Sequence, residues 1–304
     1  MNHIYCDAGG ILSKILSVVL LLTVVFSAGT VSAQTSKGVW WWRGEDVARP
    51  DEAARRMEFL GKHAVTEIYF CADLKRTRHD DIRRFIKAAH GYGMRVACLN
   101  GDVSWIRPGN RGFAETFALY LAYQKAAAPD EKFYALHLDV EPHQDSKLSD
   151  ARKWQLYADF VLRAAADVHA AGEKIEWDIP FWLDDKRVAY GDREDAPLLD
   201  VLTENSDCIT LMSYRDTAEA MLDVSKTEIG MAAKGKIRVV LGAETGETGE
   251  GSVVTFFEEG AAKMDAELAK VTAALEAAKV PAGAGIAIHH LGSWEKLVGK
   301  GTGK

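Results

Sequence analysis

The chain has 304 residues, a formal net charge of −7 at pH 7 and a sequence pI of about 5.8. This acidic balance argues against a nucleic acid or an anionic membrane as partner, because both favour a basic protein surface. Three cysteines follow residue 33, namely Cys71, Cys98 and Cys208, and their odd number and wide spacing fit neither a disulfide framework nor a zinc site. We expect buried free thiols.

The first predicted element is a cleavable signal peptide over residues 1–33. Lys14 precedes an apolar run, residues 15–26, which is too short to span a membrane and is typical of a signal peptide's hydrophobic region. Val31-Ser32-Ala33 fits the small-residue type of cleavage site before Gln34. We therefore expect a secreted or periplasmic protein with no stable membrane anchor after cleavage. An uncleaved anchor is the alternative.

Residues 34–304 alternate strand-like and helix-like segments, with no internal repeat and no linker. The predicted strands are 39–42, 65–71, 95–99, 133–140, 175–182, 208–214, 237–243 and 286–290. The predicted helices are 51–62, 80–90, 113–127, 154–168, 198–204, 218–233 and 264–278. Strict alternation implies parallel strands joined by right-handed crossovers, and eight such units close into a barrel.

The sequence thus predicts an α/β protein with a single (β/α)8 TIM barrel domain over residues 34–304. A doubly wound open sheet is the alternative, but no glycine fingerprint for a dinucleotide follows the first strand.

Several predicted strands carry polar residues on one face only. In the fourth strand His137, Asp139 and Glu141 share a face, and in the fifth strand Glu176 and Asp178 do so. Because side chains alternate along a strand, this pattern puts several carboxylates inside the barrel. Buried carboxylates need partners or shifted pKa values.

The active sites of this fold lie at the C-terminal ends of the strands. The candidates at or near those ends are Asp139, Glu141, Asp178, Tyr214, Glu244 and His289. We expect a functional role for Glu141 and Glu244. Glu67 and Glu176 stand earlier in their strands and fit a structural ion-pair network with Arg43, Arg215 or lysines.

Residues 133–141, Phe-Tyr-Ala-Leu-His-Leu-Asp-Val-Glu, resemble the fourth-strand signature of the family 18 glycoside hydrolases, the chitinase-type barrels. There an acidic series ends in Asp-x-Glu, and Asp139 and Glu141 match its last two acids. Tyr134 and His137 stand where the family has earlier aspartates. The resemblance implies that Glu141 is the general acid. It also implies that the oxygen of the substrate's N-acetyl group is the nucleophile and that Asp139 orients this group.

Residues 211–214, Leu-Met-Ser-Tyr, resemble the sixth-strand Met-x-Tyr-Asp of the same family, although Arg215 precedes Asp216. The resemblance implies that Tyr214 hydrogen-bonds the N-acetyl group. Trp294 lies near the position of that family's floor tryptophan.

Two looser resemblances leave the mechanism open. Clan A glycosidases carry catalytic glutamates at the ends of strands four and seven, where Glu141 and Glu244 stand, and in that case Glu244 would attack directly. Residues 138–142, 214–218, 244–247 and 287–290 together look like a group of secreted bacterial proteins without an assigned activity.

Tryptophans supply a second argument for a carbohydrate, because sugars present apolar C–H faces that suit rigid aromatic walls. Those at or just after predicted strands are Trp40, Trp41, Trp42, Trp105, Trp182 and Trp294. The predicted substrate-binding residues are Trp41, Arg43, Asp178, Trp182, Arg215, Asp216, His289 and Trp294.

The sequence therefore favours a hydrolase that cleaves a glycosidic bond in an oligo- or polysaccharide, without a cofactor or metal. One alternative is a non-catalytic glycan-binding barrel. Another is a metal-dependent deacetylase or phosphodiesterase, because His137, His143, His289 and His290 stand near acidic residues. No His-x3-His spacing supports this last alternative.

Overall fold

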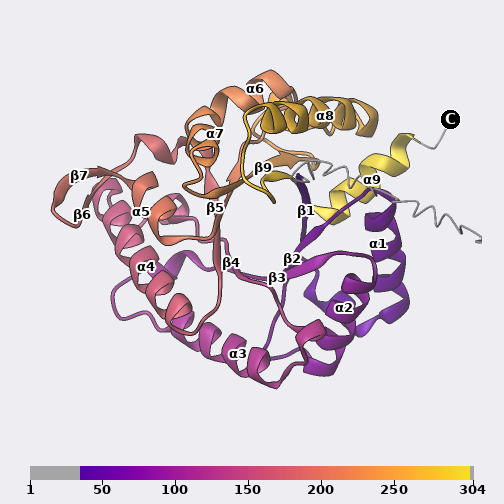
Figure 1. Ribbon diagram of the computed structural model, residues 1–304, viewed down its shortest axis with the longest axis horizontal. Helices are drawn as coiled ribbons and strands as arrows, with labels where there is room; N and C mark the ends of the chain where they lie inside the picture. The colour runs from indigo at the N-terminus through magenta and orange to yellow at the C-terminus, as the bar shows by residue number, and fades with distance from the viewer. Residues whose placement is uncertain (1–34, 302–304) are drawn as a thin grey trace, which may run out of the picture. The chain divides into compact units, whose positions relative to one another are not determined.

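The computed structural model describes residues 35–301, so the predicted signal peptide lies outside the described residues. Eight parallel strands form a closed barrel in the order β1-β10-β9-β8-β5-β4-β3-β2 (Figure 1). They are β1 (Ser36–Trp41), β2 (Glu67–Cys71), β3 (Arg95–Asn100), β4 (Leu136–Leu138), β5 (Ile175–Pro180), β8 (Cys208–Met212), β9 (Arg238–Glu244) and β10 (Gly285–His289). The (β/α)8 barrel prediction is confirmed.

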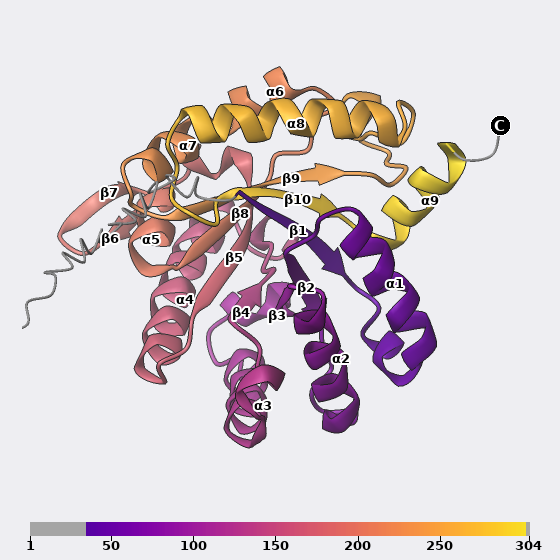
Figure 2. The same cartoon turned by 45° about the vertical axis from the view of Figure 1, so that its right-hand side comes forward.

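Helices surround the barrel and cover the outer face of the strands (Figures 1 and 2). They are α1 (Pro50–Lys62), α2 (His79–Gly91), α3 (Gly112–Ala126), α4 (Asp150–Ala170), α5 (Leu198–Asn205), α6 (Ala218–Val224), α7 (Lys226–Ala233), α8 (Ala261–Ala277) and α9 (Leu291–Gly301). Between residues 35 and 301, none of them combines the length and hydrophobicity that crossing a bilayer requires.

The two faces of each strand have separate roles. Outward-facing side chains such as Ile68, Leu136 and Trp177 belong to the main apolar core between strands and helices. A smaller inner cluster, which includes Trp40, Tyr69, Ala97 and Val240, fills the barrel. The inner face also carries the polar residues of β4 and β5, and this arrangement brings their side chains to the barrel axis.

The N-terminal end of the barrel holds a buried ion-pair network. Glu67 pairs with Arg95 at 2.5 Å and with Arg238 at 3.0 Å, and Glu176 pairs with Arg238 at 2.5 Å. The hydroxyl of Tyr134 donates to either carboxylate, at 3.1 and 3.0 Å. A structural role for the two glutamates agrees with the expectation, but their cations differ from it.

The expected cations were wrong because they stand at the other end of the barrel. Arg43 follows β1 and Arg215 follows β8, so both lie beyond the C-terminal ends of their strands. Glu67, Arg95, Glu176 and Arg238 all stand at or near the first residue of their strands.

Other differences lie in the connections. A hairpin of β6 (Arg187–Tyr190) and β7 (Arg193–Pro197) precedes α5, and α9 completes the eighth unit. The helix expected over 218–233 divides at Ser225 into α6 and α7. The fourth strand is much shorter than residues 133–140, because the chain leaves the sheet after Leu138 and Pro142 begins a 3-10 turn. This early end places Asp139 and Glu141 at the barrel mouth.

Candidate active site

Six predicted site residues lie close together at the C-terminal end of the barrel, and we call this region the mouth. They are Asp139, Glu141, Asp178, Tyr214, Glu244 and His289. The rings of Tyr214 and His289 lie 5.6 Å apart. Burial, followed by the negative charges of Glu244, Asp178, Asp139 and Glu141, raises the pKa of Tyr214 well above its ordinary value. The sequence therefore identified groups that the fold brings together.

Asp139 and Glu141 form a pair that favours the protonated state. Burial raises the pKa of Asp139 to about 8, and the negative charges of Asp178 and Glu141 add to this effect. Within the described residues, Oδ1 of Asp139 is buried without a hydrogen-bond partner. Burial and the charge of Asp178 also raise the pKa of Glu141, whose side chain is 20% exposed. The pair can hold a proton at neutral pH and offer it at the mouth.

Glu244 has the opposite environment. Its Oε1 accepts the backbone N–H groups of Thr245 and Gly246 at 2.7 and 2.6 Å, and its Oε2 lies 2.6 Å from Nδ1 of His289. Burial alone would raise the pKa of Glu244, but the His289 interaction and the two backbone donors outweigh it and lower the pKa. Glu244 is thus held as a carboxylate.

His289 is oriented by an aromatic donor on the other side of its ring. Nε1 of Trp42 donates to Nε2 of His289 at 3.2 Å, which leaves Nδ1 to donate to Glu244. Both ring nitrogens are therefore engaged within the protein.

Asp178 lies beneath the mouth. Its side chain is 2% exposed, and its two oxygens are bonded to Nε1 of Trp40 and Nε2 of His137, each at 2.8 Å. The predicted substrate contact is therefore replaced by an internal one, and Asp178 acts on the mouth through its charge.

The rim of the mouth carries four further predicted residues, namely Arg43, Trp182, Arg215 and Asp216. Trp182 packs edge-on against His143 at 5.3 Å, and Nε2 of His143 lies 3.8 Å from Glu141. Arg215 lies over the ring of Phe181 at 4.7 Å. The half-buried Asp216 follows it, and the exposed Arg43 pairs with Glu45 at 3.1 Å. His143 thus connects Trp182 to Glu141.

Trp41 and Trp294 do not belong to this surface. Trp41 is 1% exposed, points outward from β1 and donates its indole N–H to Asp46 at 2.9 Å. Trp294 is fully buried in α9, where its ring packs against Phe59 and His63. Side-chain alternation explains the first case, because Trp40 and Trp42 take the inward face of the strand.

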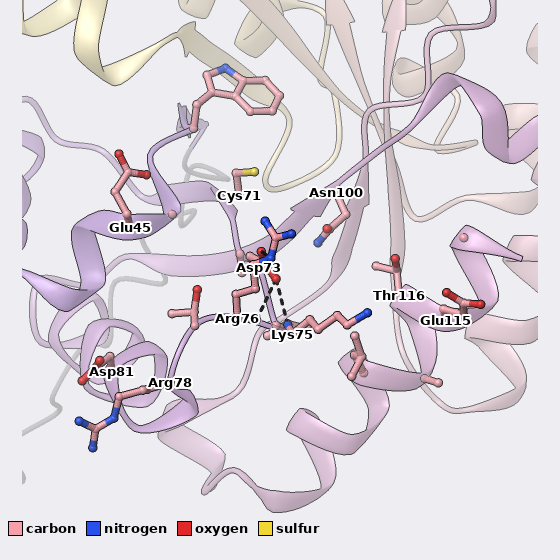
Figure 3. A pocket seen from close by; sticks show the side chains of 18 of the residues that line it. Glu45, Cys71, Asp73, Lys75, Arg76, Arg78, Asp81, Asn100, Glu115 and Thr116 are labelled. Carbon is pink, nitrogen blue, oxygen red and sulfur yellow. Dashed lines mark hydrogen bonds and ion pairs between the residues drawn. The ribbon is translucent and has the colours of Figure 1, made fainter.

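A pocket of about 1240 Å³ adjoins the mouth at the ends of β1, β2 and β3 (Figure 3). Its inner wall contains Trp42, Cys71 and Asn100. Asp139 donates its backbone N–H to the carbonyl of Asn100 at 2.9 Å, so this wall borders the acidic pair directly. Asp139 and Glu141 do not themselves line the pocket, which extends the mouth sideways.

The outer wall of the pocket is polar. It comes from the loop between β2 and α2 and from α3. Asp73 accepts the backbone N–H groups of Lys75 and Arg76, and Lys75 extends toward Thr116 on α3 (Figure 3). Sequence reasoning assigned no role to this loop or to Asn100, and it named Trp42 among the tryptophans near strand ends without including it in the predicted substrate-binding residues. The sequence pattern did indicate the position of Trp42, because it stands two residues after Trp40 and therefore on the same, inward face of the strand.

A metal centre has no support in the arrangement of ligands. Across residues 35–301, no group of three or more His, Cys, Asp or Glu side chains is placed to hold a metal ion. His137 and His289 have both ring nitrogens engaged by the protein.

No protein-family model and no curated protein matches this chain. Solved structures do resemble it. A class V chitinase from Pseudomonas fluorescens Pf-5 has 14% sequence identity and a TM-score of 0.52, covering 88% of this chain and 99% of that one. One of two fungal β-1,4-galactanases has 12% identity and a TM-score of 0.52, covering 84% and 88%.

A D-psicose 3-epimerase from Clostridium cellulolyticum H10, solved with D-tagatose, has 14% identity and a TM-score of 0.50, covering 89% and 93%. Hydrolases and epimerases thus share this barrel. At such identities the likeness shows the fold alone, which is the fold that the chitinase-type resemblance implied.

Proposed function

We propose that this protein is a carbohydrate-active hydrolase that cleaves a glycosidic bond, with Glu141 as the general acid. The observation that carries the proposal is the division of the mouth carboxyl groups into two kinds. The pKa values of Asp139 and Glu141 are raised, whereas that of Glu244 is lowered. Such a separation assigns acid and base roles.

Glycoside hydrolysis needs both kinds of group. A proton donor must reach the leaving oxygen, and negative charge must stabilise the oxocarbenium-like centre. Glu141 is the more accessible acid at the rim, and Glu244 is the carboxylate held ionised across the mouth. Trp42 and Trp182 offer aromatic faces for sugar rings, and the adjoining pocket has room for further units of an oligo- or polysaccharide.

The first experiment replaces Glu141 by Gln, which keeps the shape of the side chain and removes its ionisable proton. The substrate is found by screening oligosaccharides and identifying the products by mass spectrometry. Its turnover should fall by roughly 10²–10⁴-fold while binding is retained. Glu58→Gln is the control, because Glu58 lies on the surface in an exposed pair with Lys62. Equal turnover by Glu141→Gln and wild type would contradict the assignment.

Two further variants distinguish the mechanisms. If Glu244 attacks the sugar directly, Glu244→Gln should be as damaging as Glu141→Gln. If the substrate's N-acetyl group is the nucleophile, Asp139→Asn should reduce turnover more than Glu244→Gln does, and only N-acetylated sugars should react. Binding without turnover in all forms, wild type included, would instead favour the non-catalytic glycan-binding barrel.

We also propose that the protein acts outside the cytoplasm after removal of residues 1–33. The support is the apolar run 15–26 followed by Val31-Ser32-Ala33. N-terminal sequencing of exported protein should begin near Gln34. An intact form that starts at Met1 and stays in the membrane fraction would refute this proposal.

A further inference from the structure

A ladder of polar side chains runs along the barrel axis, from the ion-pair network at the N-terminal end to the mouth. Above Arg238, Oε2 of Glu176 lies 3.1 Å from Nδ1 of His137. Nε2 of His137 lies 2.8 Å from Oδ1 of Asp178, and Oδ2 of Asp178 accepts from Trp40. His137 therefore connects the ion-pair network to the mouth.

The geometry around His137 determines its protonation. A neutral imidazole has one N–H donor and one acceptor nitrogen. Both ring nitrogens of His137 face carboxylate oxygens, which only accept hydrogen bonds. In a neutral ring, one nitrogen would carry no proton, and its lone pair would face a negatively charged oxygen. The side chain is completely buried, and the ring of Tyr69 stacks on it at 4.1 Å, which leaves no space for another partner. The site therefore suits an imidazolium that donates twice.

The charges of the ladder also balance only with a cationic His137. The anions are Glu67, Glu176 and Asp178, and the matching cations are Arg95, Arg238 and His137. A buried carboxylate without a counter-charge is strongly destabilising. Burial alone would lower the pKa of His137, but the charges and hydrogen bonds of Asp178 and Glu176 outweigh it and raise the pKa to about 10.

The titratable and charged groups around His137 come from every neighbouring part of the barrel. They are Glu67 and Tyr69 of β2, Arg95 of β3, Tyr134 and Asp139 flanking β4, Glu176 and Asp178 of β5, Cys208 of β8 and Arg238 of β9. On the mouth side, the positive charge of His137 opposes the other influences on Asp139 and lowers its pKa.

We propose that His137 is a positioning residue, a buried imidazolium clamped by Glu176 and Asp178, which limits the carboxyl groups at the mouth to a single shared proton. Without this cation, Asp139 and Glu141 would lose the positive charge beneath them, and the pair would take up a further proton at neutral pH. Its effect on turnover rests on the proposed function, whereas its effect on the carboxyl titration does not.

The test starts with the unmodified protein. Nitrogen-15 NMR of the His137 ring, assigned by through-bond correlation with its own backbone, should show two protonated ring nitrogens from pH 5 to pH 9. A ring with one protonated nitrogen at pH 7 overturns the inference. This measurement is made on the native protein, so it tests the protonation state of His137 even if the variant does not fold stably.

The second arm follows the carboxyl carbons of Asp139 and Glu141 during a pH titration. His137→Gln should raise the apparent pKa of the pair by roughly one unit, because an adjacent positive charge is lost. The basic limb of the pH–rate profile should move by the same amount, with kcat affected more than KM. His169→Gln is the matched control, because His169 pairs with Asp207 at 3.0 Å on the exposed surface.

The outcomes separate the two proposals. An unchanged titration of the pair in His137→Gln overturns the role of His137, whatever the turnover. A raised titration in a protein that hydrolyses no glycan supports the role of His137 and removes the proposed function.

Discussion

At the scale of single residues, Asp139 occupies the most costly position in the mouth. Its Oδ1 is buried without a partner among residues 35–301, and its carboxylate form faces the charges of Asp178 and Glu141. Proteins keep such groups where chemistry requires them, because desolvation and like charge shift the pKa into a useful range. The same arrangement predicts that the folded protein loses measurable stability when Asp139 ionises.

Asp139→Asn should stabilise the protein at alkaline pH. A folded-state pKa of about 8 lies above the unfolded value, so the native state binds the proton more tightly. The stability of the wild type is therefore full below about pH 4 and falls as the pH rises toward 8. Urea unfolding should find Asp139→Asn more stable by about 1–3 kcal/mol at pH 8, because the neutral amide removes the charge that is costly to bury beside Asp178 and Glu141.

Asp130→Asn is the control for this measurement. Asp130 is exposed, and its hydrogen bond to Lys87 lowers its pKa, so its replacement should give no gain at pH 8. Equal pH dependence of unfolding in Asp139→Asn and wild type would contradict the prediction.

At the scale of elements, the site depends on the close approach of the segments that follow β3 and β4. A Cβ atom on Gly101 would overlap the carbonyl oxygen of Asp139 and lie 2.5 Å from its carbonyl carbon. Backbone atoms cannot rotate away as a side chain can, so only glycine permits this contact. Gly101 thus holds the acidic segment against the end of β3.

Gly101→Ala should therefore impair both folding and chemistry. Overpacking of this kind costs about 1–3 kcal/mol, and the shift of Asp139 should also reduce kcat. Urea unfolding and turnover should be compared with Gly91→Ala at the end of α2, where a Cβ meets nothing within 4 Å. If both variants behave like the wild type, the contact at Gly101 does not position the acidic segment.

At the scale of the whole molecule, the mouth and the adjoining pocket lie next to each other at the C-terminal ends of the strands. The shared wall of Trp42, Cys71 and Asn100 joins them. Under the proposed function, a glycan that reacts at Glu141 would extend into this pocket. Chain length should therefore influence binding.

Thr116→Trp should fill the pocket from α3. The KM for longer oligosaccharides should rise about tenfold, which corresponds to about 1.4 kcal/mol, while the shortest substrate should react as before. Lys125→Trp places the same side chain on an exposed part of α3 and should change neither. Equal KM values for short and long substrates in Thr116→Trp would show that the glycan takes another path.

The order of elements and the polar faces of the strands were determined by the sequence itself. Strict alternation of strands and helices leaves few topologies, and a period of two assigns Asp139, Glu141 and Glu176 to one face. Local periodicity therefore sufficed for the barrel and for the acidic residues at its mouth.

The partners of those residues were decided only by the tertiary structure. Periodicity along one strand says nothing about the register between strands, which pairs Glu176 with Arg238 and His137 with Asp178. It placed Trp41 and Trp42 on opposite faces of their strand, but only closure of the barrel turns Trp41 toward the helices and Trp42 toward His289. Contacts between segments distant in the chain depend on the register in which all eight strands close, and no local pattern in the sequence encodes that register.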